Sequence, residues 1–134
     1  DLLEASDIVS INTPLNKETT GMVNKDFLNK MKKGSYLINL SRGPIVSNND
    51  LILEKLLSNH LEGYATDVWI NEPPLKNDNL NMAWKENDHN LRGRIIVNPH
   101  TAYFSEEALY ESRSKASSTC LDIINKKRIN NRIV

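Results

Sequence analysis

The chain has 134 residues, of which 39% are hydrophobic, so it can bury one ordinary core and is too short for two full domains. Its 17 Lys and Arg residues equal its 17 Asp and Glu residues in number, so no overall field favours a nucleic acid, an anionic membrane surface or a polyanionic substrate. We therefore expect a small, neutral or singly charged ligand, and neither a nucleic-acid nor a membrane partner.

The cysteine content and the apolar runs bear on the cellular compartment of the protein. Cys120 has no second cysteine with which to form an internal disulfide, so we expect a reducing, cytoplasmic compartment and a packing role for this side chain. No run approaches the roughly 18 apolar residues of a membrane span, and no basic-then-apolar leader is present. The sequence begins at Asp1, in a segment typical of the end of a helix, and we expect a further segment before it.

Four short runs rich in β-branched and apolar residues predict β-strands: residues 7–12, 36–40, 63–69 and 95–97. Pro14 and Pro99 stop the first and the last of them, because proline cannot donate a ladder hydrogen bond. Residues 36–40 are almost wholly apolar, which is typical of a strand covered on both faces in a parallel sheet.

Helices are predicted between and after these runs. One starts at Asn24, with Gly34 as its C-terminal cap, and another is capped within residues 47–49 and runs to about residue 59. The last and longest starts at Ser105, whose hydroxyl caps a first turn that contains two glutamates. Its predicted buried stripe is Leu109, Ala116, Cys120, Ile123 and Ile124.

The alternation of strands with helices predicts an α/β fold that forms part of a doubly wound parallel sheet with right-handed crossovers. Residues 71–94 carry prolines, many polar residues and no clear periodicity, so we predict a long loop there. In sheets of this kind, ligands bind beyond the carboxyl ends of the strands. The residues that follow the strands are therefore the candidates for a functional site.

Each predicted strand ends in polar or charged residues: Thr13, then Ser41 and Arg42, then Asp67, then His100. The guanidinium fork of Arg42 suits a carboxylate better than any other side chain does, although an arginine after a strand can also be a plain surface residue. Gly43 beside it would let the backbone approach a ligand.

His100 could be a structural histidine or a catalyst. Glu72, on the exit loop of the neighbouring strand, could hold the imidazole in one tautomer and so make it a competent general acid and base. Asp67 could cap the loop that follows it or accept a hydrogen bond from a carboxamide, and both remain open. No Cys/His cluster has metal-ligand spacing and no serine lies in a Gly-x-Ser-x-Gly turn, so we predict neither a metal site nor acyl transfer.

The sequence contains four segments whose order and approximate spacing match a known family: SDIVSINTPLNKETTGMVN, FLNKMKKGSYLINLSRGPIV, LEGYATDVWINEPP and NPHTAYFSEEA. With them the chain resembles the D-isomer-specific 2-hydroxyacid dehydrogenases. That family includes D-lactate and D-3-phosphoglycerate dehydrogenases and the C-terminal-binding protein corepressors. The resemblance runs through nearly the whole chain and implies part of a Rossmann-like NAD-binding domain whose N-terminal half is missing from this sequence.

The resemblance implies NAD-dependent hydride transfer between a D-2-hydroxy acid and a 2-oxo acid. Arg42 would bind the substrate carboxylate, His100 would transfer the proton at the 2-oxygen, and Glu72 would pair with His100. Asp67 would hold the nicotinamide carboxamide. The residues implied to bind the cofactor are Thr13, Pro14, Leu40, Ser41, Arg42, Asp67, His100 and Tyr103.

The resemblance also implies an organisation in two parts. Residues 1–104 would belong to the dinucleotide-binding domain, whereas residues 105–134 would form a long helix and a tail that return to a separate substrate domain. The full-length protein would be a homodimer.

This sequence departs from the family pattern in three ways. It contains no Gly-x-Gly-x-x-Gly turn, so we expect the chain alone to bind NAD poorly and to be inactive. Residues 73–94 are longer and more polar than the usual link, and we expect a mobile insertion. Tyr103 and Phe104 stand where many members have small residues, a feature of the corepressor branch. The alternative function is therefore an NAD(H)-sensing binding module with little or no turnover, and a third is a truncated product with a structural role only.

Overall fold

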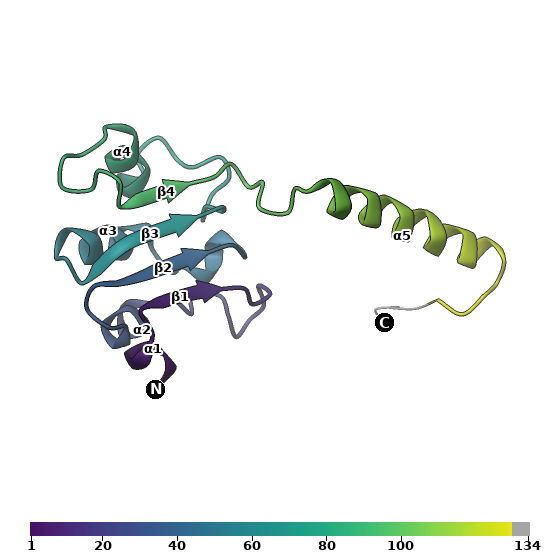
Figure 1. Cartoon of the computed structure of the whole chain (residues 1–134), viewed down its shortest axis with the longest axis horizontal. Helices are drawn as coiled ribbons and strands as arrows, with labels where there is room; N and C mark the ends of the chain where they lie inside the picture. Colours follow the sequence, from purple (N-terminus) through teal and green to yellow (C-terminus); the bar gives the residue numbers. More distant parts are fainter. Residues whose placement is uncertain (130–134) are drawn as a thin grey trace. The chain divides into compact units, whose positions relative to one another are not determined.

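The computed structural model describes residues 1–129. Two compact units make up the chain: one spans Asp1–His100, and the other begins at Thr101. The first unit holds a four-stranded parallel sheet in the order β1-β2-β3-β4 (Figure 1). Its strands are Ile8–Ile11 (β1), Ser35–Asn39 (β2), Leu61–Thr66 (β3) and Ile95–Val97 (β4). The predicted α/β class with a parallel sheet is confirmed.

One row of residues crosses the sheet at the carboxyl ends of the strands. Ile11 pairs with Asn39, Asn39 pairs with Thr66, and Thr66 pairs with Val97. The segments that follow the four strands therefore leave the sheet at one common edge, although they lie far apart along the chain. This register is what brings the polar strand ends together.

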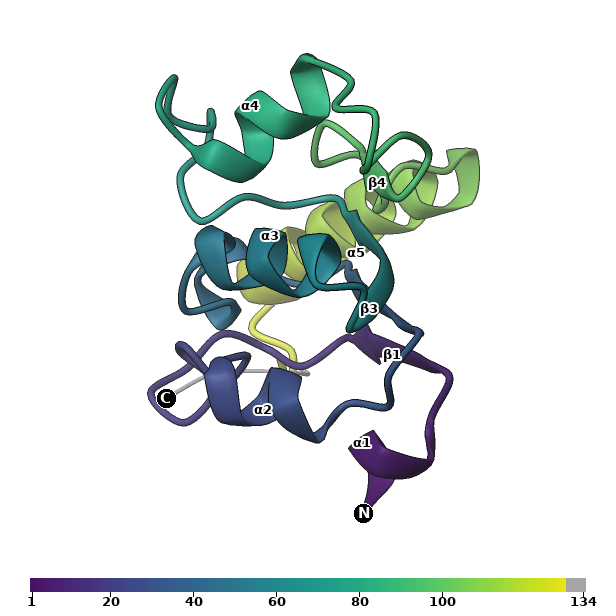
Figure 2. The ribbon, with the colours of Figure 1, turned by 90° about the vertical axis from the view of Figure 1, so that its left-hand side faces the viewer.

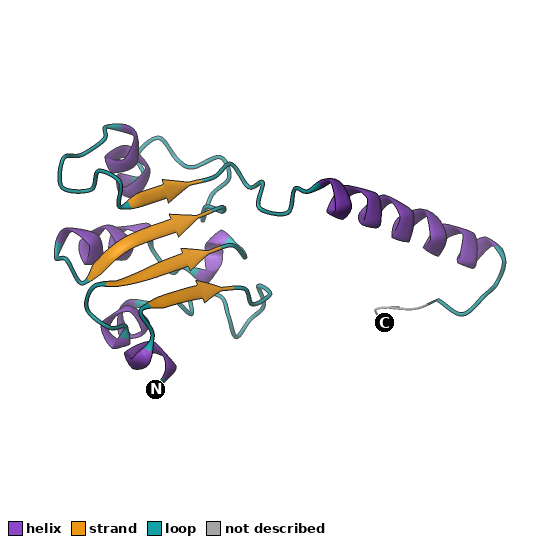
Figure 3. Cartoon of the chain, viewed as in Figure 1, coloured by secondary structure: helices purple, strands orange, loops and turns teal. Residues whose placement is uncertain are grey.

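Three helices lie on one face of the sheet, and each begins after a residue whose side chain accepts a backbone N–H. They are Lys25–Lys30 (α2), Asn49–Leu57 (α3) and Asn79–Lys85 (α4), capped by Asn24, Asn48 and Asp78. The short helix Leu2–Ala5 (α1) precedes β1, and the 3₁₀ turn Gly43–Ile45 (η1) follows β2. Figure 2 shows α2, α3 and α4 as a layer beside the strands, and Figure 3 shows the alternation of helix and strand. Buried aliphatic side chains such as Leu28, Leu37 and Ile52 form the core of the unit.

The sheet also carries apolar side chains that the described residues do not cover. Ile8 and Ile96 are each 61% exposed, and Tyr36 is 47% exposed. Our expectation that residues 36–40 are covered on both faces is therefore wrong for residues 1–129: Leu37 is fully buried, whereas Tyr36 and Leu40 are exposed. An apolar run identifies a strand, but its composition does not reveal which face the helices of the same chain reach.

Residues 71–94 do not form the featureless loop that we predicted, because they contain α4. The Asp78 side chain accepts from the Asn81 backbone N–H at 2.9 Å and starts this helix. Leu80 and Leu91 are buried in the main core, which anchors the segment to the first unit. The helix has only seven residues, two of them asparagines. A segment of this length contains too few apolar residues to show a helical periodicity in the sequence.

Two further element ends differ from the prediction. Helix α2 ends at Lys30, and Gly34 lies beyond it in a left-handed turn with a φ of 80°. Strand β3 ends at Thr66 rather than at residue 69. The Thr66 hydroxyl donates to the Val68 carbonyl at 2.6 Å and accepts from the Val68 N–H at 3.2 Å, which turns the chain out of the sheet.

The second unit contains the helix Glu106–Ile124 (α5). Its predicted N-cap is confirmed, since the Ser105 hydroxyl accepts from the Ala108 N–H at 3.0 Å. The predicted buried stripe is wrong for the described residues: none of α5 is buried, and Cys120 is exposed. An apolar stripe identifies the face of a helix that would gain from burial. It does not show that another part of the chain covers that face. Within residues 1–129, no helix combines the length and the apolar character needed to cross a membrane.

Candidate active site

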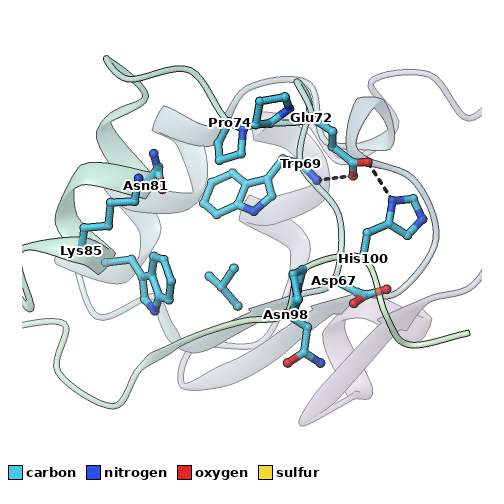
Figure 4. A pocket seen from close by; sticks show the side chains of 12 residues that line it. Asp67, Trp69, Glu72, Pro74, Asn81, Lys85, Asn98 and His100 are labelled. Atoms are coloured by element: carbon cyan, nitrogen blue, oxygen red, sulfur yellow. Dashed lines mark hydrogen bonds and ion pairs between the residues drawn. The ribbon is translucent and has the colours of Figure 1, made fainter. Parts of the chain in front are cut away.

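Glu72 and His100, which follow β3 and β4, lie side by side at the common edge of the sheet (Figure 4). His100 Nδ1 and Glu72 Oε2 are 2.7 Å apart, and the other carboxylate oxygen, Oε1, accepts from the Trp69 backbone N–H at 3.0 Å. Both oxygens of Glu72 are therefore held. The carboxylate partner that would orient the imidazole is in place.

The surroundings of Glu72 favour its charged form. Burial by itself would raise the pKa of Glu72, but the hydrogen bonds with His100 and Trp69 and the positive charges of His100 and Arg42 together lower this pKa below its usual value. Arg42 follows β2, as Glu72 and His100 follow β3 and β4. The three residues predicted to be catalytic therefore leave the sheet at one common edge.

The backbone of His100 is strained. Its φ is 56°, in the left-handed region that costs a residue with a side chain about 1–2 kcal/mol. The last hydrogen bond between β4 and β3 is donated by the Asn98 N–H to the Thr66 carbonyl at 2.9 Å, and the chain turns immediately afterwards. Strain of this kind persists where neighbouring groups hold it and is frequent at functional sites. Here the Glu72 carboxylate holds the ring.

Gly43 fixes how the turn that carries Arg42 packs against the chain after β3. A Cβ at Gly43 would lie 1.7 Å from the Trp69 carbonyl oxygen and 2.4 Å from the Ile70 nitrogen, so only glycine permits this approach. We expected Gly43 to admit a ligand to the backbone. Instead, it packs η1 against the peptide that leads from β3 to Glu72. The Arg42 side chain lies along the same turn, with Nη1 donating to the Ser41 carbonyl at 2.8 Å.

Asn39 is a site residue that our sequence analysis missed. Its side chain is fully buried, with Oδ1 accepting from the Ser41 N–H at 3.1 Å and Nδ2 donating to the Arg42 carbonyl at 3.1 Å. Its backbone carbonyl accepts from the Asp67 N–H at 3.0 Å. One residue therefore shapes the turn that carries Arg42 and joins it to Asp67. The signal was available, because an asparagine inside an apolar run needs buried hydrogen-bond partners.

Tyr64 continues this buried polar network on β3. Burial raises the pKa of Tyr64 to about 12, while hydrogen bonds with Thr66 and Asn39 act in the opposite direction and the charge of Asp78 adds to the rise. Thr66 in turn shapes the bend at Val68. The turns that carry Arg42 and Asp67 are tied to each other at Asn39, whose carbonyl accepts from the Asp67 N–H.

Five of the residues predicted to bind the cofactor line one cavity of about 650 Å³: Thr13, Pro14, Leu40, Ser41 and Arg42. The Ser41 hydroxyl donates to the Thr13 carbonyl and so ties the turn after β2 to the turn after β1. The crevice beyond the carboxyl ends of parallel strands is where dinucleotides bind in sheets of this type. The mixture of hydroxyl, apolar and cationic side chains here fits part of such a cofactor.

Asp67, Glu72 and His100 line a second cavity of about 550 Å³. Asp67 is buried, at 2% exposure, and Figure 4 shows it with His100 among the residues that line this cavity. Tyr103 belongs to the second unit, where it is 66% exposed, and its role stays a prediction. Over residues 1–129, no group of three or more His, Cys, Asp or Glu side chains is arranged to hold a metal ion.

Comparison with known proteins identifies the family. The family model described as D-isomer specific 2-hydroxyacid dehydrogenase, NAD binding domain, matches residues 1–102. A D-specific alpha-keto acid dehydrogenase of Enterococcus faecium is 34% identical over 126 residues, which are 91% of this chain and 39% of that protein. A D-3-phosphoglycerate dehydrogenase of Bacillus subtilis is 39% identical over 121 residues, which are 90% of this chain and 21% of that protein.

Solved structures agree with this assignment. The D-lactate dehydrogenase of Aquifex aeolicus, complexed with NAD and lactic acid, superposes with a TM-score of 0.77 at 26% identity and covers 93% of this chain. The match uses 39% of that structure, so the chain spans well under half the length of these relatives. The chain belongs to the D-isomer-specific 2-hydroxyacid dehydrogenase family and corresponds to part of its NAD-binding domain.

Proposed function

We propose that the full-length protein is an NAD-dependent oxidoreductase that interconverts a D-2-hydroxy acid and the corresponding 2-oxo acid. The observation on which the proposal rests is the 2.7 Å contact between His100 Nδ1 and Glu72 Oε2 at the edge of the sheet where the turn that carries Arg42 also ends. A substrate of this class has one carboxylate and one oxygen whose proton changes during the reaction. A guanidinium and an acid–base imidazole are the side chains that serve these two groups.

His100 would move the proton. Because Glu72 accepts from the Nδ1–H, Nε2 is the nitrogen left to exchange a proton with the substrate. During reduction, the Nε2–H donates to the 2-oxo oxygen, and during oxidation a neutral Nε2 takes the hydroxyl proton. The lowered pKa of Glu72 keeps its carboxylate charged, so it stabilises the imidazolium that precedes or follows each transfer.

Arg42 would bind the substrate carboxylate through two parallel N–H···O bonds and thereby orient C2. Asp67 would accept a hydrogen bond from the nicotinamide carboxamide at the end of β3. Thr13, Pro14 and Ser41 would line the cofactor together with Leu40. When bound, NAD accepts or supplies the hydride at C2.

NADH oxidation by the full-length protein tests the proposal. The substrates are pyruvate, phenylpyruvate and longer aliphatic 2-oxo acids, each beside a ketone or aldehyde of similar size that lacks the carboxylate. We expect turnover with at least one 2-oxo acid and none with its matched control. His100→Ala should lower kcat by roughly 10²–10⁴-fold and leave the dissociation constant for NADH unchanged. A variant that turns over at the original rate contradicts the role of His100.

A second candidate is an NAD(H)-responsive binding module with little turnover. Its support is the pair Tyr103 and Phe104, which are 66% and 61% exposed in the second unit, because neighbouring exposed aromatic rings favour contact with another surface. In that case no 2-oxo acid is reduced, and NADH changes the sedimentation of the protein instead.

We further propose, from the family resemblance alone, that the protein is a homodimer in the cytoplasm. Sedimentation equilibrium of the full-length protein tests the first statement, and imaging of a tagged copy in the source cell tests the second. A monomer, or a signal outside the cytoplasm, contradicts them.

A further inference from the structure

The 550 Å³ cavity has an apolar part that the proposed reaction does not use. Both tryptophans of the chain line it, together with prolines and Val97. In Figure 4, Trp69, Pro74 and Asn81 lie to one side of the Glu72–His100 pair. We call the part lined by Trp69, Pro74, Asn81, Trp84 and Val97 the Trp cavity.

The walls of the Trp cavity favour a flat apolar occupant. Trp69 is nearly buried, whereas Trp84, on α4, is 39% exposed. Planar indole rings, and the apolar faces of pyrrolidine rings, offer surfaces against which another ring can stack, and an exposed tryptophan ring gains from being covered. The volume of the whole cavity lies within the range of about 300–1,000 Å³ that small-molecule sites occupy.

Asn81 supplies the polar feature. It is 1% exposed, and its Nδ2 donates to the Leu75 carbonyl at 3.4 Å. Across residues 1–129, no group hydrogen-bonds to its Oδ1, and a buried acceptor without a donor is unfavourable. Less than 1 Å² of Oδ1 is accessible, so a ligand reaches it only when the amide turns toward the cavity. The long bond to Leu75 opposes that turn weakly.

We propose that the Trp cavity binds a planar aromatic molecule that carries one N–H or O–H donor. The ring lies against Trp69 and Trp84, and the donor binds Asn81 Oδ1. The residues involved come from α4, β4 and the loop after β3. Arg42 does not line this cavity, whereas Glu72 and His100 line another part of it. The inference holds whether or not the protein turns over 2-oxo acids.

Two probes of nearly the same shape test the donor. The ¹⁵N-labelled full-length protein is titrated with indole and, separately, with 1-methylindole, which lacks the N–H. Spectra follow the indole N–H signals of Trp69 and Trp84, assigned with Trp69→Phe and Trp84→Phe, and the side-chain amide of Asn81. We expect saturable shifts at all three residues. Indole should bind roughly two- to tenfold more tightly than 1-methylindole, which is the range for one neutral hydrogen bond.

Two variants separate the donor contact from the ring contact. Asn81→Leu keeps the size of the side chain and removes the acceptor, so the ratio of the two dissociation constants should fall to about one, as expected when no hydrogen bond remains. Trp84→Leu, at a side chain that folding leaves partly exposed, should weaken both probes by the same factor and preserve the ratio.

Three results would overturn the proposal. The first is the absence of saturable shifts at both tryptophans with either probe. The second is a ratio that stays the same in Asn81→Leu. The third is displacement of indole by pyruvate in proportion to pyruvate binding, because the probe would then occupy the reacting centre. None of these results depends on a dehydrogenase assay, so failure here is distinguishable from failure of the proposed function.

Discussion

His100 Nδ1 lies 2.7 Å from Glu72 Oε2, although 28 positions separate the two residues and they follow different strands. The contact exists because β3 and β4 are in register at Thr66 and Val97 and both chains leave the sheet at the same edge. The Trp69 N–H holds the other oxygen of Glu72. Histidine and carboxylate therefore form one unit whose parts can be changed separately.

Glu72→Gln should slow the reaction without loosening the substrate. Glutamine keeps an oxygen for the Trp69 N–H but removes the charge opposite His100. We expect kcat to fall roughly 10- to 100-fold, the equivalent of about 1.5–3 kcal/mol for a hydrogen bond to a charged group. KM for the 2-oxo acid should change little, because Arg42 is untouched. Steady-state kinetics measure both, and a raised KM at constant kcat speaks against the assignment.

Arg42→Lys tests the fork of the guanidinium and not its charge. Lysine still places a positive charge near Glu72, but it binds a carboxylate as a single point donor. We expect KM for the 2-oxo acid to rise roughly tenfold, the loss of about one charge-assisted hydrogen bond. Arg42→Gln, which removes the charge as well, should be worse in both KM and kcat. If KM stays at its original value in the lysine variant, Arg42 is not the carboxylate anchor.

Gly43→Ala should destabilise the fold through a steric clash alone. Its Cβ would lie 1.7 Å from the Trp69 carbonyl oxygen, so η1 must move, and we expect the free energy of unfolding to fall by about 2–4 kcal/mol. Gly34→Ala is the matched control, because Gly34 has a φ of 80° and no atom within 4 Å of a new Cβ. That variant should lose only about 1–2 kcal/mol, the cost of the left-handed backbone. Urea denaturation compares the two, and equal losses contradict the steric explanation.

Asn39→Leu should disturb Arg42 without touching the substrate. It leaves the Ser41 N–H and the Arg42 carbonyl without their side-chain partners, so we expect a loss of about 2–4 kcal/mol in unfolding free energy. Because the turn that holds Arg42 is released, KM should rise while the dissociation constant of NADH changes less. Kinetics and cofactor titration at a temperature where the variant stays folded measure this split. A variant that loses stability but keeps its KM shows that Asn39 has no positioning role.

Tyr64→Phe should change how stability depends on alkaline pH. The pKa of Tyr64 is raised from 10.0 to about 12 in the folded protein, so the neutral side chain stabilises the fold fully below pH 10. As pH rises from 10 toward 12, the unfolded chain loses this proton first, and stability falls by up to about 1 kcal/mol per pH unit. Phenylalanine has no such proton. The stability of the wild type minus that of Tyr64→Phe should therefore fall between pH 10 and 11, and a constant value contradicts the raised pKa.

Local sequence patterns were sufficient for the elements whose formation depends on neighbouring residues. The strand at residues 95–97 and the Ser105 cap follow from a β-branched run and from a side chain that accepts a nearby N–H group. Local patterns were insufficient for α4, whose seven residues acquire stability by burying Leu80 in the core. Short helices depend on tertiary packing more than on intrinsic propensity.

The sequence by itself determined that polar residues follow each strand and that parallel strands deliver them to one edge, because both facts depend on order along the chain. Only the tertiary structure decided that Glu72 meets His100, that Gly43 lies against the Trp69 carbonyl, and that Asn39 supports Arg42. These contacts depend on the register between strands and on which side chains are buried together. Both are properties of the packed chain, because a buried polar group must find its partner wherever folding places one.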